Sequence, residues 1–395
     1  MSLTTYTCPV CHSSDLEMFI EIPRVPVYCN VLWPTRDEAL HAPRGDIRLA
    51  FCKGCTHIFN IAFDPGRMEY TQEYENPLHF SPRFQEYAMS LAERLIKDYD
   101  LYDKDVIEIG CGKGDFLSML CELGNNRGFG FDPSYEYGRI DNVSKDQITF
   151  IQDFYSERYS NHKADIICCR HVLEHIQYPR EFLANLRDTI GNRTETVVFF
   201  EVPNVNFTLR DLGIWDLIYE HCSYFSTGSL ARVFTASEFE VCDLHEAFDG
   251  QFLCIEALPR QDLAPSKHEP WNEDFEGMTR EVSMFAEKYR DKVEVWRREL
   301  ERIGQTGLRA VVWGGGSKGV TFLNTLKVKD EIEYVVDINP HKQEKHVAGT
   351  GQKIVSPDFL KDYKPDFVFV MNPIYREEIR QKLKQMALNP EVISV

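Results

Sequence analysis

Two glycine-rich segments, each directly after a short apolar run, restrict the possible folds of this chain most strongly. The first is Glu108-Ile-Gly-Cys-Gly-Lys-Gly-Asp, which follows Val106 and Ile107. The second is Gly314-Gly-Gly-Ser-Lys-Gly319, which follows the run from Arg309 to Trp313. An apolar strand that ends in such a loop and continues into a helix is typical of ligand-binding α/β units. We therefore expect one unit of this type in the first half of the chain and a second near its end.

Strand and helix patterns alternate after the first loop, which predicts an α/β fold with a parallel sheet covered on both faces. A helix is expected from Ser81 to about Asp98, before the first strand at 106–109. Further strands are expected at 128–131, 148–151, 165–169 and 196–201, helices at 115–122 and 179–190, and a closing hairpin at 241–244 and 252–258. A smaller set of strands is expected at 309–313, 332–336, 366–371 and 392–395.

A chain of 395 residues is long for one domain, so two or three domains are expected. We predict an N-terminal module at 1–70, a first α/β domain at 71–260, and a linker helix with a smaller Rossmann-like domain at 261–395. The segment 259–274 has the prolines and charges of a linker, and a charged helix follows it to about Ile303.

Four cysteines in two Cys-x-x-Cys turns predict a metal site in the N-terminal module. They are Cys8 with Cys11 and Cys52 with Cys55. Two such turns supply four thiolates for a tetrahedral zinc, and a complete ligand set of this kind indicates a structural rather than a catalytic ion. The separation exceeds usual finger spacing, so the segment between the turns should contain its own strands. The alternative is two unrelated pairs of buried cysteines.

The composition of the chain indicates its cellular location and the kind of substrate it binds. The chain has no apolar run long enough to span a bilayer and no signal peptide at its start, so we expect a cytoplasmic protein with reduced cysteines. The net charge of −18 repels phosphate backbones, so a small-molecule substrate is favoured over a nucleic acid.

The first glycine loop predicts a site for S-adenosylmethionine. Its spacing is G-x-G-x-G rather than the G-x-G-x-x-G that holds a pyrophosphate, and it suits close approach of an amino acid group. Its expected contacts are Glu108, Gly110, Gly112 and Gly114.

Later strand ends supply the other expected contacts with this cofactor. Asp132 would accept the ribose hydroxyls, Asp153 and Phe154 would meet the adenine, and His171, in Arg170-His-Val-Leu-Glu-His175, lies at the same sheet edge. A nucleotide-fold domain that binds another ligand is the alternative.

These segments resemble the three-domain sugar C-methyltransferases, which act on nucleotide-activated deoxysugars. The resemblance covers nearly the full length, and its most specific stretch is Glu220-His-Cys-Ser-Tyr-Phe-Ser226. It implies a class I methyltransferase domain between a zinc-binding module and a C-terminal domain that shapes the sugar-nucleotide cleft. It also implies methyl transfer to a carbon next to a ketone of a nucleotide-linked sugar.

The resemblance implies His221 as the base and Glu220 as the adjacent acid, which would orient the imidazole or take the proton itself. A neutral imidazole suits proton removal from carbon. A family tyrosine two residues before the glutamate is replaced by Ile218, and Tyr219, one position on in an expected helix, would turn by about 100°. Tyr74 is the nearest match to a second family tyrosine, with His79 also available.

Three alternative functions stay open from the sequence. The second loop, with Asp337 at a suitable distance, matches a dinucleotide fingerprint and would suit an NAD-dependent oxidoreductase. A small-molecule O-methyltransferase would use the same first loop, and a non-catalytic scaffold would keep the folds. The sequence leaves open whether the protein is a monomer or a dimer.

Overall fold

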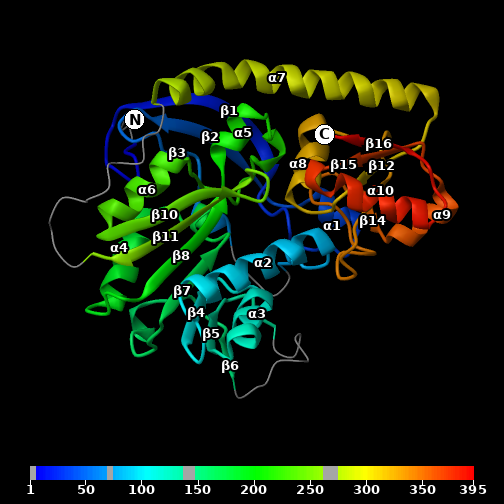
Figure 1. Ribbon diagram of the computed structural model, residues 1–395. Helices are drawn as coiled ribbons and strands as arrows, with labels where there is room; N and C mark the ends of the chain where they lie inside the picture. Colours follow the sequence, from blue (N-terminus) through cyan, green and yellow to red (C-terminus); the bar gives the residue numbers. More distant parts are fainter. Residues whose placement is uncertain (1–5, 69–73, 137–146, 261–274) are drawn as a thin grey trace.

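A computed structural model describes residues 6–68, 74–136, 147–260 and 275–395. Its strands form sheets of four, seven and five strands. Figure 1 shows the first two sheets together on the left and the five-stranded sheet on the right. The residues at 261–274, where a linker is expected, lie outside the described residues.

The seven-stranded sheet has the order β10-β11-β8-β7-β4-β5-β6, and β4 to β8 run parallel while β10 and β11 form an antiparallel hairpin against β8. Its strands are β4 Asp105–Ile109, β5 Arg127–Phe131, β6 Ile148–Ile151, β7 Ile166–Arg170, β8 Val197–Pro203, β10 Phe239–Ala247 and β11 Phe252–Pro259. The chain leaves β4 on one side and returns on the other at β7. The carboxyl ends of β4 and β7 therefore adjoin at a switch point, where open α/β sheets bind ligands.

Helices cover both faces of this sheet. They are α2 Pro82–Asp98, α3 Asp115–Gly124, α4 Pro179–Ile190 and α6 Thr227–Ala236, while α5 Val205–Arg210 packs in the core beneath the N-terminal strands. Buried residues of α2 and α3 share one apolar core with the sheet, whereas those of α4 and α6 share another. Two expected features are confirmed here: the class I α/β arrangement with its closing hairpin, and the helix at 179–190, which begins with proline and ends before Gly191.

The five-stranded sheet is parallel throughout, in the order β14-β13-β12-β15-β16. Its elements are β12 Ala310–Trp313, α8 Ser317–Leu326, β13 Tyr334–Val336, β14 Lys353–Val355, α9 Leu360–Tyr363, β15 Phe367–Val370, α10 Arg376–Gln385 and β16 Glu391–Ser394. The sequence did not predict β14, because three residues beginning with lysine form no recognisable apolar pattern; the pairing with β13 makes them a strand.

The four-stranded sheet combines distant parts of the chain in the order β1-β2-β3-β9. Its strands are β1 Leu16–Pro26, β2 Arg44–Cys52, β3 Ile58–Asn60 and β9 Ser223–Tyr224, and α1 Arg36–Leu40 lies between the first two. The expected strands between the two Cys-x-x-Cys turns are thus confirmed. Strand β9 comes from the segment after β8, so the N-terminal sheet is completed by the region next to His221.

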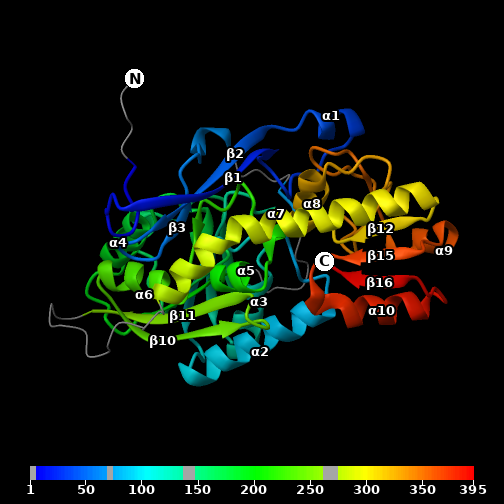
Figure 2. The same cartoon turned by 90° about the horizontal axis from the view of Figure 1, so that it is seen from above.

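One long helix, α7 Phe275–Thr306, joins the parts of the molecule. Figures 1 and 2 show it crossing the N-terminal sheet and reaching the five-stranded sheet. Buried residues of β1, β2, α5, α7, α8 and β12 belong to a single apolar core, so these parts are packed firmly together.

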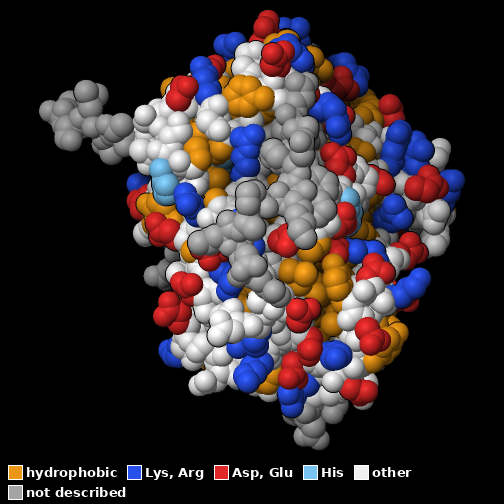
Figure 3. Space-filling view, turned by 60° about the vertical axis from the view of Figure 1, so that its left-hand side comes forward, with side chains coloured by type: hydrophobic (Ala, Val, Ile, Leu, Met, Phe, Trp, Pro, Cys, Tyr) orange, Lys and Arg blue, Asp and Glu red, His pale blue; other side chains and the backbone are white. Residues whose placement is uncertain are grey.

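The surface is mixed in charge. On the face in Figure 3, Lys and Arg side chains are interspersed with Asp and Glu. Among the described helices, none combines the length and apolar composition that a membrane span requires.

Candidate active site

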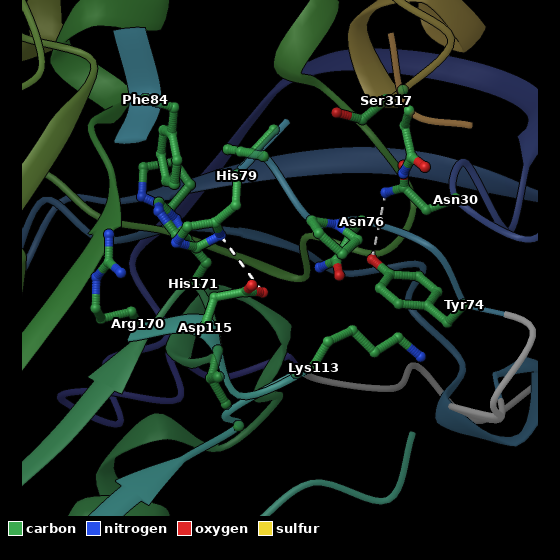
Figure 4. A pocket seen from close by; sticks show the side chains of 18 of the residues that line it. Asn30, Tyr74, Asn76, His79, Phe84, Lys113, Asp115, Arg170, His171 and Ser317 are labelled. Atoms are coloured by element: carbon green, nitrogen blue, oxygen red, sulfur yellow. Dashed lines mark hydrogen bonds and ion pairs between the residues drawn. The ribbon is translucent and has the colours of Figure 1, made fainter. Parts of the chain in front are cut away.

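A cavity of about 510 Å³ lies between the seven-stranded and the five-stranded sheets. The segments after β4, β5 and β7 line one side of it, and the start of α8 with the segments after β13 and β15 lines the other. Figure 4 shows Arg170 and His171 on one side of this space and Tyr74 and Ser317 on the other. The carboxyl ends of parallel strands from two sheets therefore converge on one cavity.

The first glycine loop forms the floor of one end. Gly112 has φ +55°, and a side chain there would enter open space in the cavity, whereas one at Gly110 would overlap the Val172 side chain. The Gly112 N–H donates to Asp132 Oδ2 at 2.8 Å, and Asp132 Oδ1 accepts from the N–H of Ser134 at 2.7 Å. The carboxylate expected to meet a ribose is thus held beside the loop on the cavity wall.

Glu108 and His171 both line this end of the cavity. Glu108 is 3% exposed, and its Oε2 has no hydrogen-bond partner in the described parts of the chain, so burial raises its pKa to about 8. Burial lowers the pKa of His171, but contacts with Glu174 and Glu201 outweigh it and raise the pKa to about 9. His171 Nε2 lies 2.8 Å from Glu201 Oε1.

The two residues predicted to contact the adenine, Asp153 and Phe154, differ in their position relative to the cavity. Phe154 is 65% exposed and lines the cavity, as does Tyr155. Asp153 faces elsewhere: its carboxylate accepts from the Phe154 N–H at 2.8 Å and the Tyr159 hydroxyl at 2.6 Å, and it also pairs with Arg158. This corrects the expectation that Asp153 meets the cofactor, because Asp153 turns to Tyr159 and Arg158 and is not among the residues that line the cavity.

His221 lies in the cavity wall between the two ends. Its ring is 5.0 Å from the His175 ring, centroid to centroid, and single ligand atoms of Glu174, His175 and His221 all lie within 4.8 Å of one another. Burial, together with the charge of His175, lowers the pKa of His221 to about 4, so the imidazole is neutral at pH 7. The sequence places Glu174 and His175 after β7 and gives no sign that they meet His221; the fold brings them together.

Glu220 does not orient this imidazole, which corrects the prediction. Its Oε2 accepts from the Cys29 N–H at 3.1 Å, it also hydrogen-bonds to Tyr74, and burial raises its pKa. Only the backbone carbonyl of Glu220 turns towards the histidines, 2.9 Å from His175 Nδ1. The carboxylates that act on His221 are therefore Glu174 and, more weakly, Asp216.

Tyr74 and His79 line opposite sides of the cavity (Figure 4). The Tyr74 hydroxyl accepts from Asn30 Nδ2 at 3.4 Å, close to Glu220. His79 Nδ1 lies 3.6 Å from Asp115 Oδ2, its Nε2 has no partner within the described ranges, and burial lowers its pKa. The segment containing Tyr74 therefore reaches both ends of the site.

The chain around residue 218 forms a turn, not the expected helix. Ile218 lines the cavity, while the Tyr219 hydroxyl accepts from the Asp64 N–H at 2.9 Å. Tyr219 therefore does not replace the family tyrosine.

The second glycine loop lines the far end of the cavity together with Lys342 and Asp337, and the Gly315 N–H donates to Asp337 Oδ2 at 2.8 Å. Helix α8 begins after Gly316 without a side-chain cap, which leaves its first N–H groups without that partner. Lys342 is 6% exposed, and its Nζ donates to Asn30 Oδ1 at 3.4 Å. Lys318 is paired with Asp216. Sequence reasoning missed Lys342 and Asn30, because neither belongs to a motif.

The four predicted metal ligands converge away from the cavity. Their Sγ atoms lie within 4.8 Å of one another, with Cys8 and Cys55 3.4 Å apart and Cys11 and Cys52 3.5 Å apart. All four are free thiols. A tetrahedral zinc with bonds of about 2.3 Å places its sulfurs about 3.8 Å apart, so the cluster fits such an ion.

Comparisons with known proteins match both α/β parts. Residues 81–244 match a methyltransferase domain family, and residues 272–390 match the C-methyltransferase C-terminal domain family. The chain is 26% identical over 408 aligned residues to the C-methyltransferase NovU of Streptomyces niveus, covering 97% of this chain and 93% of that protein.

Solved structures with partial similarity include two methyltransferases. Magnesium protoporphyrin IX methyltransferase from Synechocystis PCC 6803 has 16% identity and a TM-score of 0.36, over 45% of this chain and 84% of that one. A Burkholderia thailandensis 1,6-didemethyltoxoflavin-N1-methyltransferase has 15% identity and a TM-score of 0.35, over 52% and 96%. The two matched domain families, in this order, and the full-length relative support one conclusion: this chain is an S-adenosylmethionine-dependent C-methyltransferase.

Proposed function

We propose that the protein transfers a methyl group to the carbon next to a ketone in a sugar that carries a nucleoside diphosphate. The observation that supports this most is the neutral, buried His221 in the same cavity as the first glycine loop. A carbon acid of this kind needs an uncharged base that can take a proton at neutral pH.

The cofactor end of the cavity suits S-adenosylmethionine. Gly112 leaves open space beside the loop, Asp132 can accept ribose hydroxyls through its remaining lone pairs, and Phe154 offers an exposed ring for the adenine. When bound, the cofactor supplies an electrophilic methyl group on a sulfonium.

The side chains around His221 have separate roles in the reaction. One ring nitrogen of His221 takes the proton from the acceptor carbon, and the electron pair moves towards the ketone oxygen. Glu174, close to the ring, stabilises the imidazolium that forms. Tyr74 is our candidate donor to the enolate oxygen, because its hydroxyl lies in the same cavity wall and can turn its proton from Glu220 to the bound acceptor. His79, on the cofactor side, is a candidate for positioning the methionine part rather than for proton transfer.

The far end of the cavity supports a phosphate-bearing acceptor. An uncapped helix N-terminus carries partial positive charge, and Lys342 adds a buried ammonium with one weak partner. The net charge of −18 makes this local positive surface distinctive and opposes a nucleic-acid substrate. In this proposal the second glycine loop binds the acceptor and does not bind NAD.

We also propose a structural zinc in the Cys8, Cys11, Cys52 and Cys55 cluster, because all four ligands come from the protein and leave no open position. Elemental analysis of purified protein should find about one zinc per chain. A protein that folds without zinc or iron would contradict this assignment.

Deuterium exchange tests the proposed base separately from methyl transfer. With a nucleotide keto-sugar, S-adenosylhomocysteine in place of the donor, and D₂O, the protein should exchange one carbon-bound proton, detected by mass spectrometry. His221→Ala should lower this rate by about 10²–10⁴-fold, the usual contribution of a positioned base, with cofactor affinity unchanged. Tyr74→Phe should slow the exchange less.

Three outcomes would contradict the proposal. Full exchange in His221→Ala with none in Glu220→Gln would move the base to Glu220. A methylated product with a new ether and no exchange would indicate an O-methyltransferase. Exchange that proceeds equally well with a free keto-sugar would argue against a phosphate-bearing acceptor.

A further inference from the structure

Arg170, at the end of β7, is a buried cation with an unused donor at the cofactor end of the cavity. It is 8% exposed and lines the cavity. Its Nε and Nη2 both donate to the same oxygen, Glu201 Oε1, at 3.2 and 2.9 Å. For Nη1 the described residues give no acceptor. The guanidinium lies 4.1 Å from the Phe116 ring, which holds it in place.

Glu201 alone does not account for this arrangement. The same carboxylate, 0% exposed, also contacts His171 Nε2 at 2.8 Å and accepts from the Tyr87 hydroxyl. His171 also pairs with Glu174, at 3.7 Å from its Oε1, whereas Glu201 is the carboxylate to which Arg170 donates. Burying a guanidinium is costly unless its donors are matched, so the unmatched Nη1 favours a further anion on the cavity side.

The surroundings of Arg170 add two carboxyl groups beside the first glycine loop. Glu108 Oε2 is buried without a hydrogen-bond partner in the described chain, and Asp115 lines the same part of the cavity. Figure 4 shows Arg170, His171 and Asp115 around this space. A site with a cation on one side and carboxyl groups on the other matches a free amino acid group, which carries a carboxylate and an ammonium.

We infer that Arg170 binds the α-carboxylate of the cofactor's methionine part and so positions the cofactor against the glycine loop. Glu108 and Asp115 then face the ammonium. This inference depends on the use of S-adenosylmethionine and not on the identity of the acceptor. A purely structural Arg170 would serve only as the counterion of Glu201.

Calorimetry with three ligands separates these two roles. The probes are S-adenosylhomocysteine, its decarboxylated analogue, and 5′-methylthioadenosine, which lacks the amino acid part. For the wild type, removal of the carboxylate should weaken binding by about 10–100-fold, the range for a hydrogen bond to a charged group. Arg170→Met should weaken the binding of S-adenosylhomocysteine by a similar factor. The dissociation constants of S-adenosylhomocysteine and its decarboxylated analogue should then be nearly equal. Binding of 5′-methylthioadenosine should stay within about twofold.

Arg94→Met is a matched control. Arg94 also pairs with a buried glutamate, at 2.6 Å from Glu256 Oε1, but it does not line the cavity. That variant should keep the wild-type ratio of these two dissociation constants. If Arg170→Met fails to fold, the double variant Arg170→Met/Glu201→Gln removes both partners and should likewise make the two constants nearly equal. A wild-type ratio in a folded Arg170 variant would overturn the inference, and this result would leave the exchange test of the acceptor unaffected.

Discussion

At the scale of single residues, the site depends on an imidazole that the protein keeps uncharged. The charged groups around His221 are His175, Glu174, Asp216 and His171, and burial has the largest influence on its pKa, which falls to about 4. A histidine in water titrates near 6.5 and would be partly protonated, and thus inactive as a base, in mildly acidic buffer. The environment extends the working range of the base to lower pH.

The pH dependence of deuterium exchange checks this directly. Wild-type exchange should stay constant as the pH falls from 8 to about 5.5 and decrease with a midpoint near 4. Because the charge of His175 contributes to this low pKa, His175→Asn should raise the midpoint. Stability follows the same sign: the unfolded chain takes up the proton near 6.5 and the folded chain near 4, so stability decreases as the pH falls through that interval. Unfolding curves at each pH are the control. A wild-type midpoint near 6.5 would contradict the assignment.

Residues within a motif could be predicted, whereas those that meet only through folding could not. Gly112 and Asp132 lie at the carboxyl ends of neighbouring strands, so topology alone brings them together. Glu220 stands next to His221 in sequence, but the turn directs the two side chains apart. Glu174 reaches His221 from the short helical turn after β7, and Lys342, from the segment after β13, reaches Asn30, from the segment after β1. No local pattern encodes such contacts.

At the scale of elements, the loop between β4 and α3 requires glycine at two positions for two different reasons. Gly110 has φ +68° and lies against Val172, so its lack of a side chain serves packing. Gly112 has φ +55° with open space beyond it, so its lack of a side chain serves the ligand.

Two substitutions in this loop should therefore have different effects. Gly110→Ala should destabilise the protein by about 2–4 kcal/mol, through backbone strain and overlap with the Val172 side chain. Gly112→Val should fold with a smaller loss but bind S-adenosylhomocysteine at least about 100-fold more weakly, because its side chain enters the cavity. Thermal unfolding and calorimetry measure the two effects. Equal affinity in Gly112→Val and the wild type would exclude this loop from the cofactor site.

Helices and strands were predicted correctly where apolar residues recur regularly over a long segment and recognisable residues mark its ends. Helix α4 begins with Pro179 and stops before Gly191, and both signals are local. Strand β9 has only the residues Ser223 and Tyr224, and its pairing with β3 is the whole reason that it is a strand. Short strands of this kind exist through tertiary contacts, which a sequence pattern does not contain.

At the scale of the whole molecule, strand pairing and core packing connect the cysteine cluster to the cavity. Strand β3 follows Cys55 closely and pairs with β9, and the Asn60 N–H donates to the Cys222 carbonyl at 2.9 Å. Cys8, Cys52 and Cys55 also share an apolar core with β8 and α6 of the methyltransferase sheet. The N-terminal module thus fixes the segment that begins directly after His221, although its own metal ligands do not line the cavity.

Loss of the metal should consequently impair the base more than the cofactor site. Cys52→Ser removes one of the four proposed ligands and should loosen β3 and, with it, the turn that holds His221. We expect deuterium exchange to fall by about tenfold or more, equivalent to about 1.4 kcal/mol in activation free energy. S-adenosylhomocysteine affinity should stay within about twofold, because the glycine loop belongs to the seven-stranded sheet. Cys242→Ser, at an exposed cysteine outside the cluster, is the control and should change neither. Equal losses of exchange and affinity in Cys52→Ser would instead indicate general unfolding, and unchanged exchange in a metal-free variant would show that β9 holds His221 without the module.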